Sequence, residues 1–444
     1  MAQERVFAEA GVAEAGAVPA AVPTRPEQAR IYRPVRNQME FVPRDLDSAV
    51  AEDHTVRAIW DIVEALDLSA FYAAIKSIEG WPGHPATDPR VLVALWLYAS
   101  AEGVGSAREL DRLSREHDAY RWLRGGVPVN YHQLADFRVQ HGAALDSLLS
   151  QILAAMMDQG LVTLKRVSQD GMRVRASAGA GSFRRGERLQ QFLAQAQEQL
   201  QLLAGEVDQP EGSTSKRKRA ACKRAARERH GRIERALAEL PALQAAKKSE
   251  EQRQEARVST TDAKARVMKM ADGGFRPAYN LQLATDTQSQ VIVGVSVTNR
   301  GTDANEAPPM LQEVIGRCGA KPHDYLIDGG FATLRSVEAL TQAGVTVYAP
   351  TRAPRGTKRT PAEPRVTDTP GVAAWRARMA TEDAQTIYRE RAATSERVNA
   401  QFRQQQGLRQ FAVRGLRKVL SVALWMAIAY NLLRWIGLTK FAVA

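Results

Sequence analysis

The chain has 444 residues, enough for two or three domains and a large apolar core. Its two cysteines lie far apart and its seven histidines are scattered, which argues against a disulfide framework and a structural zinc site. A net charge of +12 and a pI of 9.8 favour a polyanion or an anionic membrane surface as partner. The cysteine usage fits a reducing cytoplasm.

The N-terminal third is expected to be helical after a loose, alanine-rich tail over 1–30, which lacks the apolar run of a signal peptide. Within 31–160, Ser106 and Asn130 each begin a capping-box spacing, and a "GGVPV" turn separates the two helical patterns. This arrangement is typical of a helix-turn-helix, so 106–143 is a candidate DNA-binding region, with His132 and Arg138 as candidate contacts. The alternative is an ordinary helix pair, because most such pairs bind no DNA.

The segment "LVTLKRVSQDGMRVRA", 161–176, is a predicted strand. Its β-branched residues lead into Asp170, and Gly171 after it permits a turn or a bulge, so Asp170 is expected at the end of the strand.

A charged helical insertion is expected over 184–257. In its basic part, 216–235, ten of twenty residues are Lys or Arg and two are Glu. A phosphate-contacting arm is one interpretation, and a solvated helical hairpin is the other. The candidate contacts of the arm are Lys216, Arg217, Lys218, Arg219, Lys223 and Arg224.

Strand patterns return in "YNLQLATD" and "QVIVGVSVT", joined by the turn "TQS". A helix then precedes the short strand "DYLID", which ends at Asp328 before two glycines, and a second helix precedes the strand "VTVYAP". A loop rich in Pro, Arg and Thr covers 350–372. This order predicts an α/β fold with a mixed sheet, spanning 161–183 and 258–444.

A helix is predicted over "TIYRERAATSERVNAQFR", 386–403. At about 100° per residue, Tyr388, Arg391, Glu396 and Arg403 share one face, and Glu390 lies on the opposite side. A core-facing stripe should be apolar, so this mixed stripe is unusual. The alternative is a surface helix with i,i+4 ion pairs.

The stretch "VLSVALWMAIAYNLLRWIGL", 419–438, is long enough to span a membrane. Because Asn431 and Arg434 interrupt it, we predict a packed helix rather than a span.

Carboxylates next to strand ends lie where open α/β sheets place their active sites. Asp170, Asp328 and Glu396 would repel one another at one spot unless cations held them there. Carboxylate oxygens suit Mg²⁺ or Mn²⁺, and two such ions can promote attack on a phosphodiester. The alternative for each Asp is an ordinary cap or turn residue.

Five blocks together give the sequence a resemblance to the DDE transposases of bacterial insertion sequences. They are "QDGMRVRA", "YNLQLATD", "LIDGGF", "YRERAATSERVNAQFR" and the helical region around "HPATDPRVLVALWLYASAEG". In that family a Tyr, an Arg, a Glu and a Lys mark the catalytic helix, and the matching positions here are Tyr388, Arg391, Glu396 and Arg403. The family's Lys is therefore Arg here, and Asn399 and Met172 replace a frequent Phe and Thr.

The resemblance implies an RNase H-like core in which Asp170, Asp328 and Glu396 hold two Mg²⁺, replaceable by Mn²⁺. It implies binding of terminal inverted repeats, cleavage and strand transfer by a cytoplasmic protein that is at least a homodimer on double-stranded DNA and binds no membrane. Tyr388, Arg391 and Arg403 would contact DNA. The rivals are a DNA-binding regulator that has lost catalysis and a non-enzymatic helical scaffold built on 184–257.

Overall fold

The computed structural model describes residues 44–77, 85–205, 213–351 and 362–443. The predicted N-terminal tail therefore lies outside the described residues, as does most of the first half of the predicted 350–372 loop. Residues Asp45–Ala444 group into one compact unit.

The predicted helical region forms α-helices from Thr55 to Asp158 in its described part, before the first strand begins at Arg166. Both predicted caps are present: the Ser106 side chain accepts from the Glu109 amide, and the Asn130 side chain accepts from the Gln133 amide. Trp96 is fully buried at the centre of this region, and its indole donates to the Leu134 carbonyl. The helices are α1 (Thr55–Ala65), α2 (Ser69–Tyr72), α3 (Pro89–Ala101), α4 (Ala107–Glu116), α5 (Asp118–Arg124), α6 (Tyr131–Gln140) and α7 (Gly142–Asp158).

A mixed sheet follows in the spatial order β4-β5-β1-β7-β8, with β6 also paired to β5. The central strand β1 is antiparallel to β5 and parallel to β7, and β8 continues the parallel side. This confirms the α/β, RNase H-like mixed sheet. The strands are β1 (Arg166–Arg175), β4 (Arg266–Lys269), β5 (Phe275–Asp286), β6 (Ile292–Thr298), β7 (Asp324–Ile327) and β8 (Thr346–Tyr348).

Helices cover both faces of this sheet. Side chains alternate along β1, so Ser168, which contacts Ser395 of α14 (Glu382–Gln404), and Gln169, which contacts the Glu306 carbonyl before α11 (Ala307–Cys318), point to opposite faces. The segment α14 therefore packs on one face and the start of α11 lies at the other. Two further helices, α12 (Leu334–Gln342) and α13 (Pro370–Met379), pack against β8.

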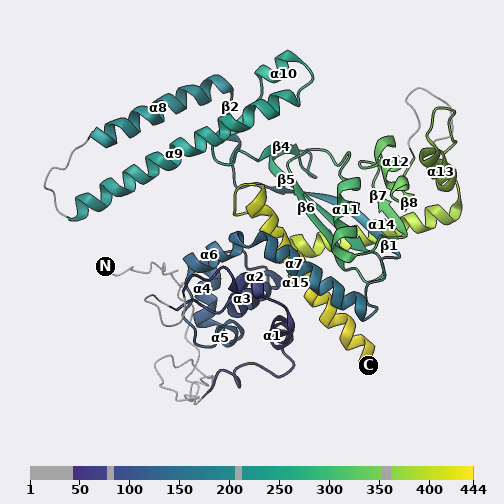
Figure 1. Cartoon of the computed structure of the whole chain (residues 1–444), viewed down its shortest axis with the longest axis horizontal. Helices are drawn as coiled ribbons and strands as arrows, with labels where there is room; N and C mark the ends of the chain where they lie inside the picture. The colour runs from purple at the N-terminus through teal and green to yellow at the C-terminus, as the bar shows by residue number, and fades with distance from the viewer. Residues whose placement is uncertain (1–43, 78–84, 206–212, 352–361, 444) are drawn as a thin grey trace, which may run out of the picture. The chain divides into compact units, whose positions relative to one another are not determined.

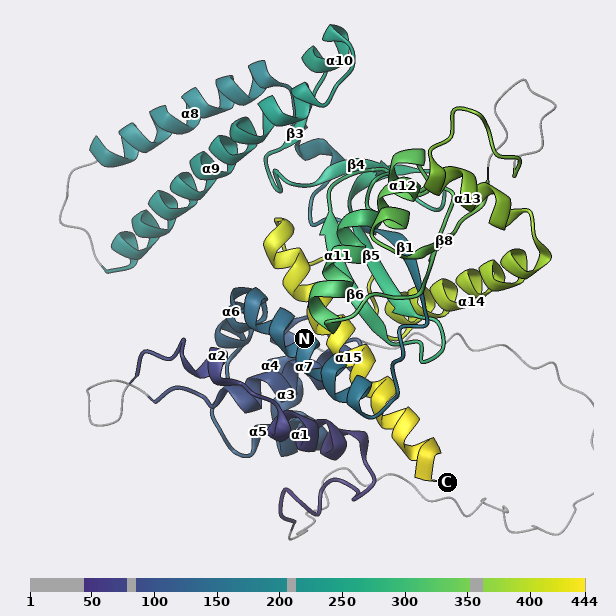
Figure 2. The same ribbon diagram turned by 45° about the vertical axis from the view of Figure 1, so that its right-hand side comes forward.

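The insertion forms a helical hairpin, which lies between β1 and β4 in the order of the chain. Its long helices, α8 (Gly186–Gly205) and α9 (Ser213–Ala245), run side by side in Figures 1 and 2. A small apolar cluster that includes Leu189 and Leu240 packs at its base, separate from the main core. The segment is completed by η1 (Ala180–Ser182), β2 (Phe183–Arg184), α10 (Glu250–Gln254) and β3 (Val258–Ser259), and β2 pairs with β3.

The last helix, α15 (Leu416–Val443), is the one described helix long and apolar enough to cross a membrane, yet 78% of its apolar window is buried inside the protein. It packs against α3, α6, α7 and β6. Its two interrupting polar residues have partners there: Asn431 exchanges two hydrogen bonds with the backbone of Ile292, and Arg434 donates to the Ser289 carbonyl. The predicted packed helix is what the structure contains.

Candidate active site

Asp170 lies in the middle of β1, and not at its end as predicted. The strand continues to Arg175 because β5 pairs with it throughout, with Asp170 opposite Leu283 and Gly171 opposite Gln282. The expected turn or bulge at Gly171 is absent from this described strand. A Cβ on Gly171 would instead lie 2.4 Å from Asp303 Oδ1 and 2.5 Å from Gln282 Nε2. The glycine therefore permits a close approach of side chains to the β1 backbone.

Asp328 follows the last residue of β7 directly, as predicted. The parallel register aligns Gln169 with Ile327, so Asp170 and Asp328 are the next residues along on neighbouring strands. Asp328 is exposed, and its Oδ1 accepts a hydrogen bond of 2.7 Å from the Gly329 amide. Two of the three predicted carboxylates thus come from adjacent positions of the central sheet.

The helix α14 supplies the groups that contact Asp170. Asn399 Nδ2 donates to Asp170 Oδ2 at 2.8 Å, and Arg391 Nη1 lies 3.7 Å from Asp170 Oδ1. Glu390, predicted to face away as an ordinary surface charge, instead pairs with Arg166 of β1 and accepts from the Thr287 hydroxyl. Glu390 therefore anchors the helix to the sheet.

Glu396 lies at the edge of the site. The buried side of α14 includes Thr394, Ser395, Val398 and Phe402, while Glu396 is exposed one turn before Asn399. Among the described residues, no group of three His, Cys, Asp or Glu side chains stands ready to hold a metal ion. The structure thus places Asp170 and Asp328 together and leaves the Glu396 carboxylate outside that pair.

Burial raises the pKa of Asp170 above its ordinary value. The Arg391 guanidinium and the Asn399 amide act in the opposite direction, and the negative charge of Asp303 adds to the rise. Burial also raises the pKa of Tyr388, against the effect of Arg391, whose guanidinium lies 5.8 Å from the Tyr388 ring centre. The negative charges of Asp328 and Asp170 contribute to the rise in the pKa of Tyr388.

Asp303 is an acidic residue near this site that the sequence analysis did not single out. It lies between β6 and α11, and the Cβ position of Gly330 is 3.8 Å from both Asp303 Oδ2 and Asp328 Oδ2. One signal could have found it: Asn280 and Gln282 alternate with leucines on a buried strand, which indicates a polar partner over that face.

The predicted DNA contacts fall into three places. Arg403 is exposed on α14, with Nε 3.2 Å from Met172 Sδ on β1. The predicted arm residues all lie on α9, where Arg217, Lys218 and Arg224 are exposed. His132 is exposed on α6.

The Arg138 guanidinium, by contrast, contacts other residues of the helical domain. Its guanidinium lies 4.7 Å from the Trp96 ring centre and donates to the Gly105 carbonyl, and burial lowers its pKa to about 10. These contacts hold Arg138 inside the helical domain, which goes against its predicted role as a DNA contact.

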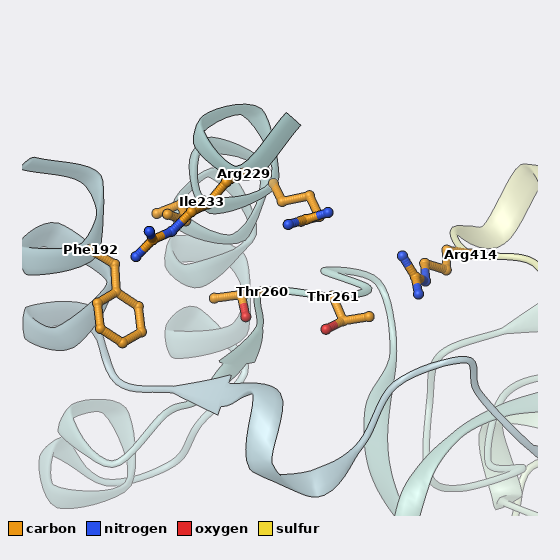
Figure 3. Close-up of a pocket in the computed structure, with 7 residues that line it drawn as sticks. Phe192, Arg229, Ile233, Thr260, Thr261 and Arg414 are labelled. Atoms are coloured by element: carbon orange, nitrogen blue, oxygen red, sulfur yellow. The ribbon is translucent and has the colours of Figure 1, made fainter. Parts of the chain in front are cut away.

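A separate cationic cavity of about 330 Å³ lies at the base of the hairpin (Figure 3). Neither Asp170 nor Asp328 is among the residues that line it, and no lining residue is acidic. Arg414 is fixed by a hydrogen bond of 3.2 Å to the Ser177 carbonyl. The lining residues are Phe192, Arg229, Arg232, Ile233, Thr260, Thr261 and Arg414.

Two family models match the chain. The "Transposase DDE domain" matches residues 254–432 and the "Transposase domain (DUF772)" matches 44–140. The chain belongs to the DDE transposases of insertion sequences. The first match includes Asp328 and Glu396 of the transposase, while Asp170 lies before it, on the other side of the hairpin insertion. Searches of curated proteins and of solved structures each found no match.

Membership makes the chain a transposase of the polynucleotidyl transferase class whose substrate is DNA, and the family generally uses divalent metal ions. The residues present fit such ions. Asp170 and Asp328 offer hard oxygen donors from adjacent strands, and a bound cation would offset the unfavourable burial of the Asp170 charge.

Proposed function

We propose that this transposase binds the terminal inverted repeats of its own insertion sequence, hydrolyses the 3′ strand ends and joins them to target DNA by transesterification. One observation carries the proposal beyond family membership: the fold brings Asp170 and Asp328 to adjacent positions of β1 and β7 and packs α14 against Asp170. A regulator that needed only DNA binding would not require this arrangement.

Asp170, Asp328 and Glu396 are the proposed ligands of two divalent cations, Mg²⁺ or Mn²⁺. When bound, such ions activate the attacking water or hydroxyl and stabilise the leaving oxygen of the phosphodiester. Glu396 is exposed on the edge of α14 that carries Asn399, so its side chain is free to turn towards the two aspartates. Arg391 and Asn399 hold Asp170 in position.

Tyr388, Arg391 and Arg403 are the proposed contacts to DNA near the transferred end. This assigns the chain to the subtype marked by Tyr, Arg, Glu and Lys, with Arg403 in the Lys position. An Arg keeps the positive charge but grips a phosphate with a planar fork, which changes how the end would be held. The Tyr388 ring lies under the Arg391 guanidinium, which also faces Asp170, and this position suits a contact to a base or sugar at the reacting end.

Three other parts of the protein are the proposed contacts to DNA away from the transferred end. The helical domain, 31–160, is the proposed reader of the element ends, and the 184–257 hairpin is a proposed phosphate-contacting arm. The cationic cavity beside Thr260 and Arg414 offers hydroxyls and guanidinium groups, which suit a phosphate of the backbone. Cutting two ends implies at least a dimer on DNA, and the proposed compartment is the cytoplasm.

The test compares wild type with Glu396→Gln on a DNA fragment that carries the chain's own gene and its flanks, with Mg²⁺ or Mn²⁺ present. We expect wild type to nick at the element ends and Glu396→Gln to lose at least about a hundredfold in rate, while both bind the fragment equally. The matched control is Glu382→Gln, which removes an exposed glutamate from the first turn of the same helix and should still cut.

Each other outcome has a definite meaning. Equal cutting by wild type and Glu396→Gln would place Glu396 outside the active site. Binding without cutting by either protein would favour a regulator that has lost catalysis.

A further inference from the structure

The cationic cavity at the base of the hairpin lies where two parts of the transposase meet. Figure 3 shows Thr260 and Thr261, which follow β3, between Phe192 of α8 and Arg414. Two arginines of α9 line the cavity as well. The threonines and Arg414 belong to the segment that matches the DDE domain, 254–432, whereas α8 and α9 lie in the insertion before it. A ligand in this cavity would therefore contact the hairpin and the catalytic domain together.

The positive charges of this cavity have no ionic partner. Arg229 Nη1 donates to the neutral Gln199 Oε1 at 3.4 Å, and Arg414 Nε donates to the Ser177 carbonyl at 3.2 Å. Among the described residues, no carboxylate forms an ion pair with Arg229, Arg232 or Arg414. Like charges around one cavity repel each other, so the arrangement is unfavourable unless an anion lies between them.

A second cavity at the base of the hairpin, of about 1130 Å³, has a different charge arrangement. Two of its cations, Lys264 and Arg266, pair with Glu239, and Arg257 pairs with Glu255. Carboxylates that neutralise basic side chains are therefore present in this part of the protein. Their absence from the lining of the smaller cavity sets that cavity apart as an anion site.

The chemistry of the smaller cavity suits a phosphate group. Guanidinium groups offer a planar fork of donors that matches phosphate oxygens, and the hydroxyls of Thr260 and Thr261 can donate beside them. A volume of 330 Å³ holds on the order of ten waters, which is more space than a small inorganic ion fills. Buried Ile233 and half-buried Phe192 add an apolar wall, which suits the sugar next to a phosphodiester.

We propose that this cavity is a phosphate-binding site, that its occupant is a phosphodiester of the DNA, and that the bound phosphate ties the hairpin to the catalytic domain. That the phosphate belongs to DNA rests on the proposed function, whereas the affinity of the cavity for phosphate does not. Without the anion, Arg229 and Arg232 of α9 repel Arg414. With it, one group binds residues on both sides, so DNA binding fixes the base of the arm.

The first test is calorimetric titration of the full-length protein with inorganic phosphate, at constant ionic strength and without DNA. We expect Arg232→Gln to weaken phosphate binding by about tenfold or more, because a charge-assisted pair of donors is lost. Arg414→Gln should weaken it to a similar extent, although it lies in a different part of the chain. The matched control is Arg257→Gln, which removes an exposed cation of the larger cavity and should bind phosphate within about twofold of wild type.

Thermal melts in phosphate-free buffer separate a ligand-binding arginine from a structural one. Arg232→Gln should melt at the same temperature as wild type or higher, because one of three mutually repelling charges is gone. A clearly lower melting temperature would make Arg232 a structural residue and overturn the proposal. Arg414→Gln keeps the binding test decisive if Arg232→Gln does not fold.

The tie between hairpin and catalytic domain is tested by hydrogen exchange. Phosphate, and separately a short DNA duplex, should slow exchange of the α9 amides around Arg232 in wild type, and neither should do so in Arg232→Gln. Wild-type phosphate affinity in both arginine variants overturns the site. Phosphate binding without slower exchange in α9 overturns the tie.

The source of the phosphate is tested with three further ligands. A short duplex should bind Arg232→Gln more weakly than Arg257→Gln. If the duplex binds both variants equally, while a nucleoside monophosphate or an oligoglutamate peptide requires Arg232, the occupant is a free nucleotide or an acidic peptide and the DNA assignment is wrong.

These measurements do not depend on catalysis, so the two proposals can fail separately. If phosphate binding requires Arg232 and wild type cuts no DNA, the phosphate site exists and the proposed function is wrong. If wild type cuts at the element ends and Arg232→Gln binds phosphate as wild type does, the proposed function holds and the phosphate site is wrong.

Discussion

Because Gly171 has no side chain, the Asp303 carboxylate and the Gln282 side-chain amide can lie close to the backbone of β1. We predict that Gly171→Ala lowers the free energy of unfolding by about 1–3 kcal/mol, because the added carbon overpacks a rigid, hydrogen-bonded group. Urea denaturation of the metal-free protein measures this change.

The matched control is Gly316→Ala in α11, where the added carbon meets nothing within 4 Å. Alanine should raise the free energy of unfolding there by up to about 1 kcal/mol, since it favours a helix interior more than glycine does. Equal stability of the two variants would show that the contacts over Gly171 are looser than described.

Single residues of the site could be predicted only where local chemistry marks them. Asp328 stands before two glycines after an apolar strand, and that pattern predicts its place after β7. The place of Asp170 within β1 is not predicted, because strand length depends on pairing with β5, more than a hundred residues away. Asp303 has no mark in its own segment, and its one signal lies in the alternating Asn280 and Gln282 of β5, because its partners come from β1 and β5.

At the scale of elements, α15 shows how buried hydrogen bonds fix an apolar helix in the interior of a protein. The fully buried Asn431 side chain satisfies both the N–H and the C=O of Ile292 at the start of β6. We predict that Asn431→Leu lowers the free energy of unfolding by about 2–4 kcal/mol, although it makes the helix more apolar, because two buried backbone groups lose their partners. Chemical denaturation measures the loss.

The comparison variant for α15 is Gly437→Ala, where an added carbon has open space. It should be neutral or mildly stabilising in the same experiment. A helix selected to span a bilayer would give the opposite ranking, with Asn431→Leu tolerated, since removing an amide from the hydrocarbon region is favourable there.

Element boundaries with side-chain caps were the most predictable part of the fold. The spacings at Ser106 and Asn130 predicted the starts of α4 and α6, because a cap is a contact within four residues. The face of α14 was predicted less well. Its periodicity grouped Glu396 with Arg391, yet packing on β1 buries Ser395 and leaves Glu396 exposed. Which edge of a helix meets a sheet is decided by the sheet.

At the scale of the whole molecule, the hairpin carries much of the basic charge on a part that contributes little to the main core. Its base has its own small cluster around Leu189 and Leu240, whereas the helical domain and the sheet share one continuous core. The exposed cations of α9 therefore do not serve the packing of the catalytic sheet. A long, charged pair of helices with its own base is suited to reach along a phosphate backbone.

The hairpin proposal predicts how DNA binding responds to salt. We expect Arg217→Gln/Lys218→Gln to weaken binding to a short non-specific duplex, and to reduce the slope of log affinity against log salt concentration by about 1–2, because each lost phosphate contact no longer releases a counterion. Fluorescence anisotropy across a salt series measures both quantities. The matched control is Lys165→Gln/Lys321→Gln, which removes the same charge from exposed positions outside the hairpin and the helical domain. If both double variants reduce the slope equally, the effect comes from net charge and the hairpin is no DNA arm. If only the hairpin variant does, residues 217 and 218 contact phosphate.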